Sequence, residues 1–247
     1  MRRYLAEFVS TFALVFAGTG AIVVNDVAGA VTHIGISLVF GLIVMAMIYS
    51  VGDISGAHMN PAVTVAFWFG NRFPLKEIAP YVVAQLLGAI AASVMLRILF
   101  FDHPNLGATL PQGPWWQSFV LEFLLTFMLM FVVLRVSVGA KEKGIMAGAA
   151  IGGTVALEAL FAGPICGASM NPARSIGPAL VSGQLQHLWI YLVATVAGAM
   201  FAVLVCRVIY CEGEEQDRPD REAPVQQPLP ASIDDFAATG TPASVDV

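Results

Sequence analysis

Two matching stretches of the sequence hold the residues whose types and spacing suggest chemistry. Both read Gly-Ala-x-Met-Asn-Pro-Ala, one around Asn60 and the other around Asn171. Asparagine is a favoured N-cap residue, because its side chain can accept a hydrogen bond from the first helical turn. Proline suits the first helical position, where its missing N–H would have no partner anyway. Each stretch therefore predicts a small-residue loop that leads into a helix, with starts at Asn60-Pro61-Ala62 and at Asn171-Pro172-Ala173.

The chemistry that such a pair suggests is electrostatic. A helix N-terminus carries about +0.5 elementary charge, and the amides of Asn60 and Asn171 add hydrogen-bond donors. If both helix starts face one point, the field there repels cations and protonated water, whereas a neutral hydroxylated molecule can present an oxygen. No nucleophile-base set argues for an enzyme. The three cysteines, Cys166, Cys206 and Cys211, lack ligand-like spacing with histidines, so we expect no metal site, cofactor or disulfide framework.

Five ionisable residues lie within or beside apolar segments. Arg174 follows the second Asn-Pro-Ala, and an arginine at membrane depth marks a functional site by default; we expect a selectivity residue at the outer mouth, with a salt bridge as the alternative. Glu7 and Glu122 open matching segments and are expected to accept backbone N–H groups of the two loops, although a proton relay is the other interpretation. Glu158 has no counterpart in the first half, and its role stays open. His58 is interpreted as a loop-packing residue, with a gate as the alternative.

The composition identifies the solvent in which these residues work. The chain has 57% hydrophobic and 12% charged residues and a mean hydropathy of +0.77, whereas a soluble domain carries about 25% charged residues. Residues 212–247 differ, with nine acidic residues against two arginines, and they predict a disordered, acidic cytoplasmic tail. The rest has ten basic and eight acidic residues and no basic stripe, so nucleic acid is not an expected partner.

The apolar runs predict an all-α membrane protein. Runs of about 20 residues are long enough to cross a bilayer, and two shorter ones are not. We expect the Gly-rich segments 53–60 and 163–171 to be irregular, which at membrane depth requires a water-lined or protein-buried setting. The expected spans are about 1–24, 33–52, 79–101, 116–137, 145–162 and 187–210, and the expected half-helices are 61–69 and 172–182.

The runs also repeat. Glu7-Phe8 opens the first span and Glu122-Phe123 the fourth, so residues 1–211 divide into halves of about 1–105 and 106–211. Three spans per half is an odd number, so the second half enters from the opposite side and forms an inverted repeat. Lysine and arginine cluster at connectors on one side, with Arg97 as an exception. We therefore expect a multi-pass protein of the cell membrane, either a plasma membrane or a bacterial inner membrane. The positive-inside rule then places both termini in the cytoplasm.

Together, the doubled Asn-Pro-Ala, Arg174 and the Glu-Phe openings resemble the aquaporin or major intrinsic protein family over residues 1–210. The resemblance implies six membrane helices, two re-entrant half-helices, passive conduction and a homotetramer with one pore per subunit. It also implies a narrow selectivity filter, whose four positions fall by spacing on Phe40, Ala159, Ala168 and Arg174.

The filter pattern is mixed within that family. Water-selective members usually have histidine where Ala159 stands, whereas Ser175 after the arginine is the water-channel residue. The run 161–175 is most similar to the plant nodulin-like branch and its bacterial relatives, which implies passage of glycerol and neutral metalloid hydroxides as well as water. Ala168 stands at the usual mercury-sensitive cysteine, which predicts weak mercurial block.

The sequence therefore predicts a passive channel in the lipid bilayer for water and small uncharged solutes, closed to protons and ions. A strict water channel is one alternative. A proton-coupled secondary transporter is another, because inverted repeats and broken helices serve such proteins too; Glu158 would be its candidate carboxylate. A structural membrane scaffold is the third alternative and predicts no permeability above that of bare lipid.

Overall fold

The computed structural model describes residues 1–137 and 145–210. This part of the chain is helical, with short connectors and no strand. The expected tail at 212–247 lies outside the described residues. The helices are α1 (Arg2–Ala28), α2 (Thr32–Ser55), α3 (Pro61–Phe69), α4 (Leu75–Leu99), α5 (Trp115–Val136), α7 (Ala147–Cys166), α8 (Pro172–Ser182) and α9 (Leu188–Ile209).

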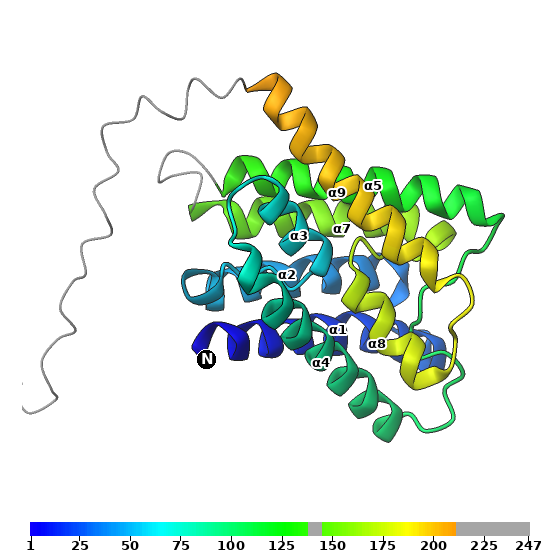
Figure 1. The fold of residues 1–247 in the computed structure, drawn as a ribbon. Coiled ribbons are helices and arrows are strands. Elements are labelled where there is room, and N and C mark those ends of the chain that lie inside the picture. The colour runs from blue at the N-terminus through cyan, green and yellow to red at the C-terminus, as the bar shows by residue number, and fades with distance from the viewer. Residues whose placement is uncertain (138–144, 211–247) are drawn as a thin grey trace, which may run out of the picture. The chain divides into compact units, whose positions relative to one another are not determined.

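Six of these helices are long and apolar enough to cross a membrane: α1, α2, α4, α5, α7 and α9. The other two, α3 and α8, have 9 and 11 residues, too few to span about 30 Å of hydrocarbon. Figure 1 shows these two short helices among the six long ones. The predicted class, an all-helical membrane fold with six spans and two half-helices, is confirmed.

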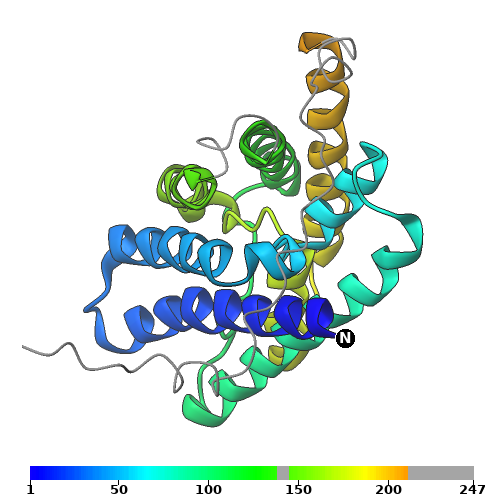
Figure 2. The same ribbon diagram turned by 90° about the vertical axis from the view of Figure 1, so that its left-hand side faces the viewer.

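The two halves use the same helix contacts. In the first half α1 packs against α2 and α4, and in the second half α5 packs against α7 and α9; α1 and α2 run side by side in both views (Figures 1 and 2). Gly88 on α4 lies against the backbone of Phe8, and Gly198 on α9 lies against that of Phe123. A side chain at either glycine would collide with backbone, so small residues set these close crossings. The α2–α7 contact joins the halves.

The ends of α2 and α7 correct one expectation. Helix α2 continues through Ser55 and α7 through Cys166, so only 56–60 and 167–171 are irregular, not 53–60 and 163–171. Gly56 and Gly167 end the helices, each with φ of 85°, a left-handed conformation that glycine adopts without steric cost. Each donates its N–H to the carbonyl four residues earlier. Pro164 is tolerated inside the last turn of α7.

Candidate functional site

The two half-helices meet at their asparagine caps. The Asn60 side chain accepts a hydrogen bond from Ala62 N (2.9 Å) and begins α3. Likewise, Asn171 accepts from Ala173 N (2.9 Å) and Arg174 N (3.3 Å) and begins α8. In both cases the cap oxygen satisfies N–H groups that a helix start leaves unpaired.

The same asparagines tie one half of the chain to the other. Asn60 Nδ2 donates to the Met170 carbonyl, and Asn171 Nδ2 donates to the Met59 carbonyl, both at 2.7 Å. This exchange brings the N-termini of α3 and α8 together. An amide nitrogen carries two N–H groups, so each asparagine keeps one for another acceptor. Both residues line the same cavity.

The loops before the half-helices have a strained backbone in matching places. Ala57 and Met59 have φ of 47° and 52°, and Ala168 and Met170 have φ of 39° and 54°. Non-glycine residues rarely adopt positive φ, and each such residue costs on the order of 1–3 kcal/mol unless its surroundings enforce it. The loop conformation therefore needs fixed partners.

Two buried carboxylates supply those partners. Glu7 accepts hydrogen bonds from His58 N (2.9 Å) and Met59 N (2.8 Å). Glu122 accepts the equivalent pair from Ser169 N and Met170 N, both at 2.8 Å. Both side chains are fully buried. A carboxylate accepts such bonds strongly, so each glutamate holds the loop of its own half.

The first half has further support that the sequence did not indicate. Glu7 also accepts from Ser55 Oγ (2.7 Å) and Gln85 Nε2 (2.8 Å). Gln85 lies on α4, four residues after Tyr81, whose hydroxyl donates to the Ser55 carbonyl (2.9 Å). These three contacts join residues 26, 48 and 78 positions apart, and no local sequence pattern indicates them.

Two cavities meet at Arg174. The first, which we call the vestibule, has a volume of about 440 Å³ and is lined by Ala159, Gly107 and Arg174 among others. The second, the inner cavity, has a volume of about 140 Å³ and is lined by Phe40, Ala168, Arg174 and both cap asparagines. Of the four expected filter residues, Arg174 lines both cavities and so marks their junction, Ala159 lines only the vestibule, and Phe40 and Ala168 line only the inner cavity.

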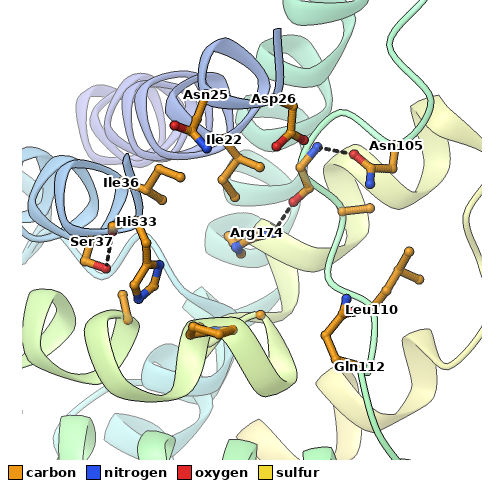
Figure 3. A pocket seen from close by; sticks show the side chains of 16 residues that line it. Ile22, Asn25, Asp26, His33, Ile36, Ser37, Asn105, Leu110, Gln112 and Arg174 are labelled. Carbon is orange, nitrogen blue, oxygen red and sulfur yellow. Dashed lines mark hydrogen bonds between the residues drawn. The ribbon is translucent and has the colours of Figure 1, made fainter. Parts of the chain in front are cut away.

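Arg174 is fixed at that junction. Its side chain is 2% exposed, its guanidinium carbon lies 5.2 Å from the centre of the Phe40 ring, and Nη1 donates to the Gly107 carbonyl at 2.8 Å. Figure 3 shows this hydrogen bond to the loop that closes one side of the vestibule. Its partner is a neutral carbonyl rather than the carboxylate that a salt bridge requires. Nothing in the sequence singled out Gly107.

Three other residues that the sequence singled out differ in whether they line a cavity. His58 borders the inner cavity, but its Nδ1 lies 3.1 Å from Thr64 Oγ1 and its ring stacks on Phe67 with centroids 4.9 Å apart. Cys166 is buried. Glu158 is fully buried, neither of its oxygens has a hydrogen-bond partner within the described residues, and it is absent from the lining of both cavities.

Comparison with known proteins decides the family. The model of the family described as "Major intrinsic protein" matches residues 1–206. The chain belongs to the major intrinsic protein family. It is 49% identical over 218 residues to aquaporin NIP1-4 of Oryza sativa subsp. japonica, covering 88% of this chain and 80% of the relative. It is 47% identical over 211 residues to nodulin-26 of Glycine max, covering 85% and 78%.

A solved structure gives the same result. The aquaglyceroporin from Plasmodium falciparum is 26% identical, with a TM-score of 0.79, and the match covers 87% of this chain and 98% of that one. The chain is therefore a membrane channel of this family, for water and small neutral solutes. Its six spans make it a multi-pass membrane protein.

Proposed function

We propose that the conducted path runs from the vestibule, past Arg174, into the inner cavity and between the asparagine caps. The observation that supports it is the position of Arg174, which borders both cavities, while Ala159 lines the vestibule and Phe40 and Ala168 line the inner cavity. In this proposal these four residues form the selectivity filter, and the two Asn-Pro-Ala motifs form the centre of the pore.

The proposed filter offers little bulk on one side. Ala159 ends at a methyl group, and Gly163 and Gly167 continue the same wall of the vestibule. Arg174 supplies fixed donors that stay charged, and Phe40 supplies an apolar face. A passage with hydrogen-bond donors on one wall and apolar side chains on the others suits small neutral molecules whose hydroxyl groups are attached to a short carbon chain or to a metalloid atom. We therefore propose glycerol-sized neutral solutes as substrates beside water.

Ions and protons are excluded in this proposal by fixed positive charge. Two helix N-termini meet at the asparagines, each with about +0.5 elementary charge, and the Arg174 guanidinium lies at the next constriction. Exclusion by half-helix dipoles and an arginine is an established property of aquaporin-type pores, and the cap geometry of this chain supports the same role here.

The assembly and orientation belong to the same proposal. The resemblance to aquaporins supports a homotetramer in the cell membrane with one pore in each subunit. The distribution of lysine and arginine supports cytoplasmic termini. With that orientation, the vestibule opens to the outside.

Stopped-flow light scattering on proteoliposomes tests the solute range. Purified protein is reconstituted, and the vesicles are challenged in turn with sucrose, glycerol and urea. We expect fast shrinkage in every solute and fast re-swelling with glycerol, because both water and glycerol cross. Re-swelling no faster than that of empty liposomes would exclude glycerol as a substrate and support a strict water channel. Equal shrinkage with and without the protein would leave a structural scaffold.

A proton-coupled transporter is the second candidate function, and Glu158 is the reason to test it. Its carboxyl group is buried and has no hydrogen-bond partner among the described residues. It lies outside the lining of both cavities, whereas coupling needs a titrating group on the path. We expect downhill glycerol flux that neither saturates nor responds to a protonophore. Flux that follows an imposed pH gradient would favour the transporter.

A further inference from the structure

Helix α7 contains a backbone carbonyl that its own helix cannot satisfy. In an α-helix the carbonyl of Leu160 accepts the N–H of the residue four positions later. That residue is Pro164, which has no N–H and whose ring pushes the carbonyl outward. A carbonyl left free in this way takes its hydrogen bond from another part of the fold or from water.

His33 supplies that partner from another helix. It lies in the first turn of α2, and its Nε2 is 2.6 Å from the Leu160 carbonyl oxygen. Because a carbonyl can only accept, Nε2 must carry the proton and donate. Gly163 makes room for the ring, since a Cβ there would lie 3.2 Å from His33 Cε1. The histidine therefore fills the notch that Pro164 and Gly163 leave at the end of α7.

This hydrogen bond lies in the wall of the vestibule, directly above the proposed filter. His33 and Gly163 both border the vestibule, and Figure 3 shows the His33 ring directed at the α7 ribbon. Leu160 follows the filter residue Ala159, and His33 precedes the filter residue Phe40 by seven positions, two helical turns along one face of α2. The bond thus joins the two filter-bearing helices at their vestibule ends.

We propose that His33 is a positioning residue for solute selection. By holding the proline-interrupted turn of α7 against α2, it sets the separation of Ala159 and Phe40 and so limits the passage of molecules larger than water. This role rests on the proposed filter. Without the bond, the Leu160 carbonyl turns to water in the vestibule and the last turn of α7 moves away from α2. The permeability to larger solutes then rises more than the permeability to water.

A double-mutant cycle isolates this role. His33→Phe keeps a ring against Gly163 but removes the donor. Pro164→Ala gives residue 164 an N–H of its own, which satisfies the Leu160 carbonyl within the helix and makes the histidine bond redundant. The four proteins are reconstituted at equal density, and the ratio of glycerol to water permeability is measured by stopped flow.

We expect His33→Phe to raise the ratio roughly threefold in the wild-type background, the scale of one lost hydrogen bond. In the Pro164→Ala background we expect almost no change. An unchanged or lowered ratio in the wild-type background would overturn the proposal. A rise of equal size in both backgrounds would overturn it as well, because the effect would then not depend on the orphaned carbonyl.

Two further variants separate this proposal from its premise. Ala159→His, measured in the same preparation, tests the filter itself. If Ala159→His changes the ratio of glycerol to water permeability and His33→Phe does not, the positioning role is overturned and the filter is supported. The reverse outcome, an effect of His33→Phe with none of Ala159→His, would overturn the proposed filter and with it the role of His33 in setting the separation of Ala159 and Phe40. If Pro164→Ala folds poorly, His33→Gln replaces it, because its amide nitrogen has a similar reach. A ratio near that of wild type then supports the proposal, and a ratio as high as in His33→Phe overturns it.

Discussion

At the scale of single residues, the one permanent positive charge of the site is held by a neutral hydrogen-bond partner. Arg174 is nearly inaccessible, and its hydrogen-bond partner is the carbonyl of Gly107 rather than a carboxylate. A paired carboxylate would cancel the field that the guanidinium projects into the junction of the cavities, whereas a carbonyl fixes the side chain and leaves its full charge in place. In each cap asparagine the two side-chain atoms also have different roles. The oxygen accepts a hydrogen bond from its own helix start, and the nitrogen donates one to a carbonyl of the other half.

Ala159→His tests the width of the proposed filter. An imidazole in place of a methyl group would project into the vestibule that Ala159 and Arg174 both line and would narrow the passage. We expect glycerol permeability to fall at least about tenfold, on the scale of steric exclusion of a poorly fitting ligand, while water permeability falls much less. Both are measured by stopped flow on the same proteoliposomes, and equal losses of the two would contradict the filter position.

Ala168→Cys tests which side chains reach the path. Ala168 lines the inner cavity, whereas the native Cys166 is fully buried, with Sγ 3.5 Å from the Ala162 carbonyl. We expect mercuric chloride to block water flux strongly in the variant, reversibly with a reducing thiol, and weakly in wild type. Strong block of the wild-type protein that survives Cys166→Ser would show that the cavity lining is wrong.

At the scale of elements, the half-helices were predictable from sequence to the residue. The three residues Asn-Pro-Ala mark a helix start by local chemistry alone, and α3 and α8 begin at Pro61 and Pro172 as expected. The ends of α2 and α7 are not predictable in this way, because the Gly-rich segments 53–60 and 163–171 suggest irregular chain where α2 continues to Ser55 and α7 to Cys166. Helix α7 passes through Gly163 and Pro164, with the histidine of another helix satisfying the carbonyl that the proline leaves free. Such a compensation joins residues 127 positions apart and has no local signature.

The α2–α7 crossing gives a prediction for helix packing. A Cβ on Gly152 would lie 2.5 Å from the Gly41 carbonyl oxygen and 2.8 Å from Met45 Cβ, whereas nothing lies within 4 Å of one on Gly153. We expect Gly152→Ala to destabilise the fold by about 1–3 kcal/mol, the usual cost of overpacking. Gly153→Ala is the matched control and should be neutral or stabilising by up to about 1 kcal/mol, since alanine favours helix. Thermal unfolding in detergent compares them, and equal stabilities would contradict the crossing.

At the scale of the whole molecule, the inverted repeat explains why each device occurs twice. One half supplies Glu7, a strained loop and Asn60, and the other supplies Glu122, the matching loop and Asn171. The duplication brings two helix N-termini together at one point, which a single half cannot do. The two halves differ at the position proposed to select the solute. Arg174 stands where the first half has Val63, and the vestibule lies on the Arg174 side of the caps.

The number of spans makes the orientation testable. Six crossings would place both termini on one side, and the basic connectors predict that this side is the cytoplasm. Arg97, the exception to that bias, donates to the Phe101 and His103 carbonyls, both at 2.7 Å, so local loop contacts hold it at the opposite face. We expect protease to remove a C-terminal tag from inside-out vesicles and to leave it intact in sealed right-side-out vesicles, with detergent-opened vesicles as the control. Cleavage in sealed right-side-out vesicles would reverse the orientation and place the vestibule on the cytoplasmic side.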